Sequence, residues 1–282
     1  MQQDRVTSTR QIAALAALFA TFFLAVPVFA EANTWQDLRD ELYDGRFMAK
    51  SDAVLSLDAP YRTTDDARTN MSVRMAAPQG QTFRSVSLIL DDNPMPVSAQ
   101  IAFADPISTF EFTATMRVNG PTPVHAVAEL SNGQLYVAET FVKTSGTGAC
   151  SAPPGTDPIE ALATLGQMEL AIRQANPDTA TLVSTLRRDA NSVLDLEVSI
   201  KHPSHSGMQM NQISLLYIPA RYVETLQLNL NGAPFATMTG SISLSENPQV
   251  TVSVPSGTNR VKAILTDTDG TVTEAERSLA DY

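Results

Sequence analysis

Cysteine, positive charge and long apolar runs are all scarce in this sequence. Only one of its 282 residues, Cys150, is a cysteine, so no disulfide can form within the chain. Lysine and arginine together number 19 against 30 acidic residues, which gives a net charge of −11, and the excess acid is spread along the chain. Nucleic-acid-binding proteins need a basic stripe or patch. The sequence contains none, so we exclude that class.

Long apolar runs are confined to the N-terminus. Arg5 and Arg10 precede an apolar stretch over residues 12–28, and the small-residue form of a secretory cleavage site ends at Ala30. We therefore predict a cleavable signal peptide over residues 1–30 and export to the periplasm. No later segment approaches the ~20 apolar residues needed to cross a bilayer. The sequence thus predicts no membrane anchor after cleavage.

Familiar catalytic motifs are absent as well. The sequence has no glycine-rich phosphate loop, nucleophile elbow or zincin motif, which disfavours an independent enzyme and implies no cofactor. What remains is Cys150, which lies among the small residues of segment 144–155 with no neighbour large enough to pack around a thiol. In an exported protein an unpaired cysteine is either a packed thiol or a reactive group. These neighbours favour a solvent-exposed, reactive thiol.

Strand patterns dominate the chain. Three segments alternate apolar and polar residues as half-buried strands do: 110–118, 194–201 and 250–254. Three dipeptides that follow apolar runs are typical of hairpin turns: Asn132-Gly133, Asn231-Gly232 and Asp269-Gly270. Short strands at this spacing predict an all-β protein built of antiparallel sandwiches.

Helix signals are few. Trp35, Leu38 and Leu42 share one face of a short predicted helix, and we interpret the tryptophan as a packing anchor. Asp157 is followed by proline at the first helical position and glutamate at the third, which is typical of a helix N-terminus. Over residues 167–190 the periodicity is ambiguous, and we interpret this stretch as a connector.

The order of several short motifs resembles the carrier proteins of bacterial sulfur oxidation. Three segments resemble SoxY and precede the cysteine segment: 35–46, 91–96 and 141–143. Five segments beyond residue 191 resemble its partner SoxZ: 200–207, 217–220, 231–232, 245–248 and 267–270. In that family SoxY and SoxZ are separate chains of a heterodimer. The whole chain resembles the fused SoxYZ-like carriers that are associated with quinoprotein dehydrogenases.

The resemblance implies a fold, a domain order and a function. It implies two immunoglobulin-like β-sandwich domains joined by a partly helical connector. The SoxY-like domain would cover residues 31–143, the cysteine-bearing arm and connector 144–190, and the SoxZ-like domain 191–282. The implied function is that of a non-catalytic carrier, which holds a sulfur-containing intermediate covalently on Cys150. Its implied partners are periplasmic redox or sulfur-handling enzymes, a quinoprotein dehydrogenase system among them.

The implied arm departs from the family pattern. In SoxY the cysteine lies in a Gly-Gly-Cys-Gly-Gly terminus that swings into partner enzymes. Here Gly146 and Gly148 keep the backbone permissive, and Ala149 and Ser151 are small replacements for glycine. A free tail of about eight residues could extend ~27 Å, whereas this arm continues into a second domain and must enter a cleft as a hairpin. An exposed thiol has a pKa near ~8.5, so we expect the partner enzyme to activate Cys150.

Two alternatives stay open. His202, His205, Met208 and Met210 lie within nine residues, and imidazole with thioether ligands suits copper, which would make the second domain a copper-binding module. The SoxZ-like pattern explains part of this segment without a metal, and no other cluster completes a ligand set. Alternatively, both domains form only a docking module for a quinoprotein dehydrogenase. His125 stands alone in a strand-like run, and we interpret it as a packed residue.

Overall fold

The computed structural model describes residues 34–146, 148–174 and 193–278. The strands of the N-terminal half (residues 34–143) are β1 (Met48–Ala49), β2 (Leu55–Asp58), β3 (Thr69–Ala76), β4 (Phe83–Leu90), β5 (Val97–Ile107), β6 (Thr109–Met116), β7 (Thr122–Leu130) and β8 (Leu135–Val142). The later strands are β9 (Met168–Gln174), β10 (Val193–Ile200), β11 (Val223–Leu230), β12 (Ala233–Gly240), β13 (Gln249–Pro255), β14 (Arg260–Asp267) and β15 (Val272–Ser278). This composition confirms the predicted all-β fold class.

The predicted strands and turns form for the expected reasons. Strand β6 buries Phe110, Phe112 and Ala114, the apolar members of its alternating pattern. The hairpins β7–β8, β11–β12 and β14–β15 turn at the three predicted dipeptides, whose glycines adopt φ values of 87°, 88° and 82°. Such positive φ angles are open to glycine at no steric cost, which is why these dipeptides are reliable turn signals.

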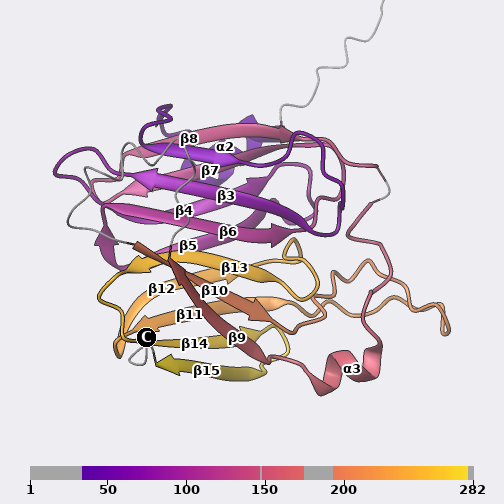
Figure 1. Ribbon diagram of the computed structural model, residues 1–282. Helices are drawn as coiled ribbons and strands as arrows, with labels where there is room; N and C mark the ends of the chain where they lie inside the picture. Colours follow the sequence, from indigo (N-terminus) through magenta and orange to yellow (C-terminus); the bar gives the residue numbers. More distant parts are fainter. Residues whose placement is uncertain (1–33, 147, 175–192, 279–282) are drawn as a thin grey trace, which may run out of the picture. The chain divides into compact units, whose positions relative to one another are not determined.

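Each of the two sheets contains strands from both halves of the chain. The nine-stranded sheet runs β1-β8-β7-β4-β5-β12-β11-β14-β15, and the six-stranded sheet runs β2-β3-β6-β13-β10-β9. The halves meet where β5 pairs with β12 and where β6 pairs with β13, both antiparallel. Figure 1 shows these magenta and orange strands side by side. The half after residue 192 (residues 193–278, the C-terminal half) therefore extends the sheets of the N-terminal half.

The apolar core is continuous across this junction. One cluster of buried side chains includes Phe112 and Met116 from β6, Val252 from β13 and Met238 from β12. Because both sheets and this core cross the junction, separating the halves would expose apolar surface and break two strand ladders. The two halves are thus joined by the same interactions that hold each sandwich together.

Two short helices accompany the sheets. In helix α2 (Thr34–Tyr43), Trp35 packs against a second apolar cluster, which confirms its interpretation as a packing anchor. Helix α3 (Pro158–Ala163) begins after Asp157, whose carboxylate accepts hydrogen bonds from two backbone N–H groups, as predicted. Among the residues described, no helix is long and apolar enough to cross a membrane.

The structure differs from the sequence interpretation after α3. Residues 168–174 were expected to belong to a connector, but they form β9, which pairs antiparallel with β10 along the edge of the six-stranded sheet. The run is short and its pattern weak, so only pairing with a distant partner makes it a strand. The predicted signal peptide over residues 1–30 lies outside the described residues.

Candidate functional site

Cys150 lies on the segment that joins β8 to α3, and its side chain is buried. Its exposed fraction is 0%, and that of the preceding Ala149 is 3%. The expectation of a solvent-exposed thiol is therefore wrong. Small residues did not leave the thiol in solvent; they allow the segment to lie closely against other parts of the chain, because their backbone can approach a neighbouring loop without side chains between them.

Three side chains hold the backbone around the thiol. Asn119 Oδ1 accepts a hydrogen bond from the N–H of Cys150 at 3.2 Å. From the C-terminal half, Ser206 Oγ donates to the carbonyl of Cys150, and Gln209 Nε2 donates to the carbonyl of Ala152 at 2.9 Å. The cysteine segment is thus held between the end of β6 and the loop after β10, which come from different halves of the chain.

Asn93 positions the residues on the N-terminal side of this contact. Its Oδ1 accepts from the N–H of Asn119 at 3.0 Å, and its Nδ2 donates to the carbonyl of Arg117 and to Ser243 Oγ, both at 2.9 Å. Asn93 is buried, so each of these hydrogen bonds is shielded from competing water. A residue of the 91–96 motif therefore fixes the turn that holds Cys150.

Arg117 is the main charged neighbour of the thiol. It is only 2% exposed, and its Nη1 donates to the carbonyls of Ser204, Ile242 and Leu244 at 2.6, 3.1 and 3.2 Å. Burial lowers its pKa, an effect opposed by the charge of a Cys150 thiolate. Sequence analysis missed this residue, because it occupies a polar position of the β6 pattern and nothing local indicates that the polar side is covered.

Burial also decides the protonation of the thiol. Desolvation raises the pKa of Cys150 above its usual range, and the nearby positive charge of Arg117 opposes this rise only in part. The docked cysteine is therefore a neutral thiol at physiological pH. A thiolate, which is the nucleophilic form, is disfavoured for as long as the segment stays in this position.

The chain that leaves the cysteine segment is held by Glu246. Its two carboxylate oxygens accept hydrogen bonds from the N–H groups of Gly155 and Thr156 at 2.8 and 2.7 Å. The neighbouring Asn247 donates to Thr156 Oγ1 at 3.3 Å. Both residues belong to the 245–248 motif. Three of the short motifs, 91–96, 200–207 and 245–248, therefore meet along one stretch of chain that contains Cys150.

The predicted arm residues form a tight turn around the cysteine. Gly146 and Gly148 have φ values of 83° and 74°, which other residues adopt only with strain. The N–H and Oγ of Ser151 both donate to the carbonyl of Gly148, at 3.0 and 2.9 Å. A Cβ at Gly148 would lie 3.2 Å from Ser151 Oγ. The turn thus requires glycine at this position.

The four residues of the copper alternative do not share one environment. His202 is buried; its Nδ1 accepts from the N–H of Ser204 at 2.9 Å, and its Nε2 faces the Asp267 carboxylate at 3.5 Å. His205 Nδ1 lies 3.1 Å from Gln209 Oε1, which belongs to the side chain that holds the cysteine segment. Both rings already serve internal contacts. No cluster of three His, Cys, Asp or Glu suited to a metal ion occurs in the described ranges.

His125 is packed, as predicted. Its ring stacks on Trp35 with centroids 3.7 Å apart and planes 5° apart, and its Nδ1 lies 2.9 Å from Asp91 Oδ1. These contacts lie on the face of β7 that α2 covers, so His125 and Trp35 attach the helix to the sheet.

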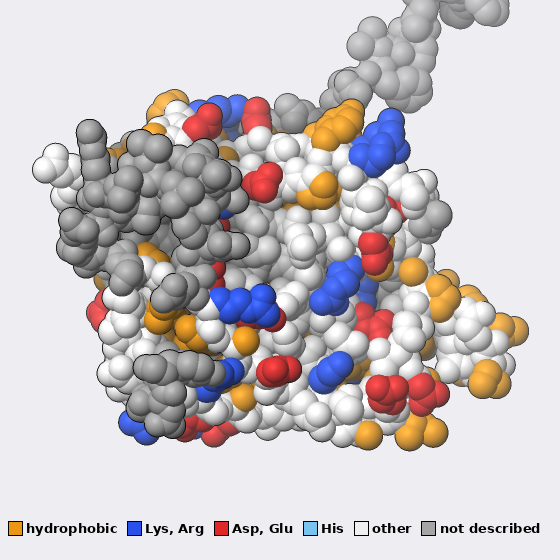
Figure 2. All heavy atoms as spheres, in the orientation of Figure 1, with side chains coloured by type: hydrophobic (Ala, Val, Ile, Leu, Met, Phe, Trp, Pro, Cys, Tyr) orange, Lys and Arg blue, Asp and Glu red, His pale blue; other side chains and the backbone are white. Residues whose placement is uncertain are grey.

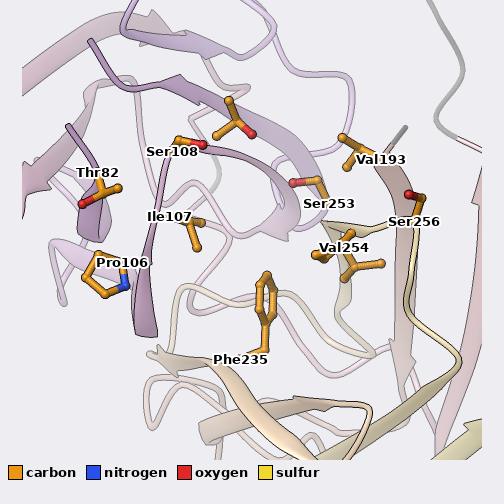
Figure 3. A pocket seen from close by; sticks show the side chains of 11 residues that line it. Thr82, Pro106, Ile107, Ser108, Val193, Phe235, Ser253, Val254 and Ser256 are labelled. Carbon is orange, nitrogen blue, oxygen red and sulfur yellow. The ribbon is translucent and has the colours of Figure 1, made fainter. Parts of the chain in front are cut away.

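One hollow of about 380 Å³ lies at the junction of the halves, between the β5–β6 turn and the end of β13. Figure 3 shows Ile107, Phe235 and Val254 pointing into it, with serine and threonine hydroxyls at its edge. Its lining has no ionisable side chain and no cysteine. The hollow therefore offers no group for acid–base chemistry. A second hollow, of about 460 Å³, is lined by Arg68, Glu169 and Lys201 but has no cysteine.

Comparisons with known proteins identify two families along the chain. The chain matches the family "Sulfur oxidation protein SoxY" over residues 39–150 and the family "Sulphur oxidation protein SoxZ" over residues 184–278. A solved structure of the sulfur carrier protein SoxY from Chlorobium limicola f thiosulfatophilum is 21% identical, with 40% of this chain and 92% of that chain covered and a TM-score of 0.34. The comparison with curated proteins gave no match.

The two family matches follow one another along the chain in the order SoxY then SoxZ. The SoxY match ends at Cys150 itself, so it includes residues 144–150 of the cysteine-bearing segment. SoxY and SoxZ proteins are non-catalytic sulfur carriers, in agreement with the expectation that this chain is not an enzyme. The chain consists of a SoxY domain followed by a SoxZ domain, two carrier domains of sulfur oxidation joined in one polypeptide.

Proposed function

We propose that this protein is a periplasmic thiol carrier that holds a sulfur-containing intermediate covalently on Cys150 and presents it to partner enzymes. The convergence of three SoxY- and SoxZ-like motifs on the cysteine segment supports this function most directly. Asn93, Ser206 and Glu246 come from three distant parts of the sequence, and each contacts the cysteine segment or the turn that holds it. Contacts from three distant motifs to one segment indicate that these motifs serve the same site.

Loading requires the cysteine segment to leave its docked position. The thiol is buried and neutral there, so its Sγ is closed to solvent and to an approaching cargo donor. Release of the hydrogen bonds from Asn119, Ser206 and Gln209 would return the thiol to water and lower its pKa towards that of a free cysteine. The docked form is then the resting state, which protects an unloaded thiol from oxidation.

The test is the intact mass of the full chain purified from its native periplasm, with and without reductant. We expect a mass increment that reductant removes, that maps to the peptide containing Cys150 and that is missing in Cys150→Ser. Its size would identify the cargo. A chain that always has the mass of the mature polypeptide, in cells actively oxidising sulfur compounds, would contradict the carrier function.

We further propose that a quinoprotein dehydrogenase system is among the partners. This part rests on the resemblance to fused SoxYZ-like carriers. The fusion supports a common task for the two domains, because one chain fixes their ratio at 1:1 and raises their effective concentration towards the mM range. Deletion of the dehydrogenase should change the adduct on Cys150; unchanged adduct mass and occupancy would rule the system out as a loading partner.

A further inference from the structure

An exposed apolar segment lies next to the cysteine site. Residues 210–217, which we call the apolar finger, leave large apolar side chains in solvent: Met210, Ile213, Leu215, Leu216 and Tyr217. Ile213 is 95% exposed. In Figure 1 this segment is part of the orange loop at the right, and Figure 2 shows apolar side chains gathered on the same projection. Contiguous exposed apolar residues of this kind typically mark an interaction site.

The finger is held in one shape. Met210 and Tyr217 form a bridge between its two sides, and Asn211 Oδ1 accepts hydrogen bonds from the N–H groups of Ile213 and Ser214 at 2.9 and 2.8 Å. Leu215 has a φ of 57°, a conformation that is strained for a side chain of this size. The protein thus maintains strain and exposed apolar surface together, as expected of a preorganised binding element.

The base of the finger is the part of the SoxZ domain that holds the cysteine segment. Gln209, directly before the finger, donates to the carbonyl of Ala152 and accepts through its own carbonyl from the N–H of Ile218 at 2.8 Å. Ser206, four residues before the finger, donates to the carbonyl of Cys150. The finger is therefore joined through Gln209 to the contacts that keep the thiol buried.

We propose that the apolar finger is the docking element for the protein that loads Cys150, and that its insertion into an apolar hollow of that partner releases the cysteine segment. The inference rests on the proposed carrier function, because a partner that reaches the thiol must displace the loop from which the finger projects. A partner that binds the released form more tightly than the docked form shifts the equilibrium by that difference in affinity.

Charge favours a protein partner over other occupants. Residues 206–220 contain no Asp, Glu, Lys or Arg, and the chain carries a net charge of −11. Two copies of such a chain repel one another, and an anionic lipid surface repels it as well. An apolar hollow on an enzyme, with a neutral or basic rim, would not repel this negatively charged chain. The finger therefore suits a partner enzyme better than a second copy or a membrane.

The experiment compares two full-length variants in cells that load the wild type. Ile213→Asp places a charge at the finger tip, and Phe47→Asp does the same at an apolar side chain of the SoxY domain that is 81% exposed. The reducible adduct on Cys150 is measured by intact mass, and thiol reactivity of the purified, reduced proteins is measured with iodoacetamide. We expect Ile213→Asp to lower adduct occupancy by at least about tenfold, as loss of a central apolar anchor does, while iodoacetamide reactivity and the Phe47→Asp variant stay as in wild type.

The other outcomes separate this inference from the carrier function. A wild type that never carries an adduct contradicts the proposed function. A loaded wild type with equal loading of Ile213→Asp overturns the finger inference alone. It is also overturned if the wild type forms dimers that Ile213→Asp abolishes, or if it sediments with vesicles of phosphatidylglycerol and phosphatidylethanolamine in a finger-dependent way. A large rise in the iodoacetamide rate of Ile213→Asp would show that the finger only holds the arm, and would overturn docking.

Discussion

The burial of Cys150 predicts strong protection of the thiol in the native protein. Three hydrogen bonds hold the segment, from Cys150 N–H to Asn119 and from Ser206 and Gln209 to backbone carbonyls. At about 1 kcal/mol each, and with part of the total offset by the ordering of the segment, docking contributes about 2–3 kcal/mol. A reagent that reacts only with the released form should therefore react roughly 30- to 150-fold more slowly than with the unfolded chain.

The assay is the rate of iodoacetamide modification at pH 7, with the same chain in urea as the reference. Ser206→Ala and Gln209→Ala each remove one hydrogen bond, so each should accelerate modification of the native protein about fivefold, which corresponds to about 1 kcal/mol. Ser256→Ala, at an exposed serine outside the site, is the matched control. A native rate equal to the unfolded rate, or no acceleration in either variant, would refute the docked arrangement.

The protection should also depend on pH with a defined sign. Burial raises the pKa of Cys150, so the docked form retains its proton to higher pH than the released or unfolded form. The stabilisation of docking is complete below the unfolded pKa of ~8.5 and is lost as the pH rises through the docked value. The ratio of unfolded to native rates should therefore fall towards one above pH ~8.5. A ratio that grows with pH would contradict the buried neutral thiol.

Three further predictions concern the buried His202, the junction of the two halves and the thiol of Cys150. Burial lowers the pKa of His202 to about 4, so the imidazole is protonated in the unfolded chain before it is protonated in the native protein as the pH falls. The free energy of unfolding, measured in urea titrations, should drop by about 3 kcal/mol between pH ~6.5 and ~4. His202→Gln should reduce that dependence on pH. A single proteolytic cut within residues 175–192 should leave both fragments together on a native sizing column, because both sheets cross the junction; separation would contradict the shared core. Cys150→Ser should abolish covalent loading and lower the melting temperature, because a hydroxyl then takes the place of a fully buried thiol. Stoichiometric Cu(I) binding that survives this change and is lost when His202 and His205 are both replaced would instead support the copper alternative.

The strand pattern and the turns were predictable because their causes are local. Alternation along β6 reflects one covered face, and the Asn-Gly and Asp-Gly pairs reflect backbone angles within the dipeptide itself. The N-terminus of α3 is local in the same way, because Asp157 caps N–H groups two and three residues away. Sequence reasoning succeeded wherever the deciding contact lies within a few residues.

The position of the thiol was not predictable, because its surroundings are contributed by distant segments. Asn119 lies 31 residues before Cys150 and Ser206 lies 56 residues after it. Small neighbours are equally compatible with an exposed loop and with a segment packed under another domain. Arg117 was missed for a related reason: an alternating pattern separates two faces of a strand but does not say which of them another segment covers.

Burial of the thiol suits a carrier whose arm continues into a second domain. A terminal arm can keep its cysteine in solvent and enter deep sites, but an arm tethered at both ends reaches less far and must be released as a hairpin. In return, the tether places the SoxZ domain where Ser206 and Gln209 can hold the unloaded thiol. Desolvation outweighs the attraction of Arg117, so the nucleophilic thiolate is disfavoured until the segment is released. Under the proposed function, docking with the partner enzyme would control reactivity, because burial favours the protonated form of Cys150 until the segment is released.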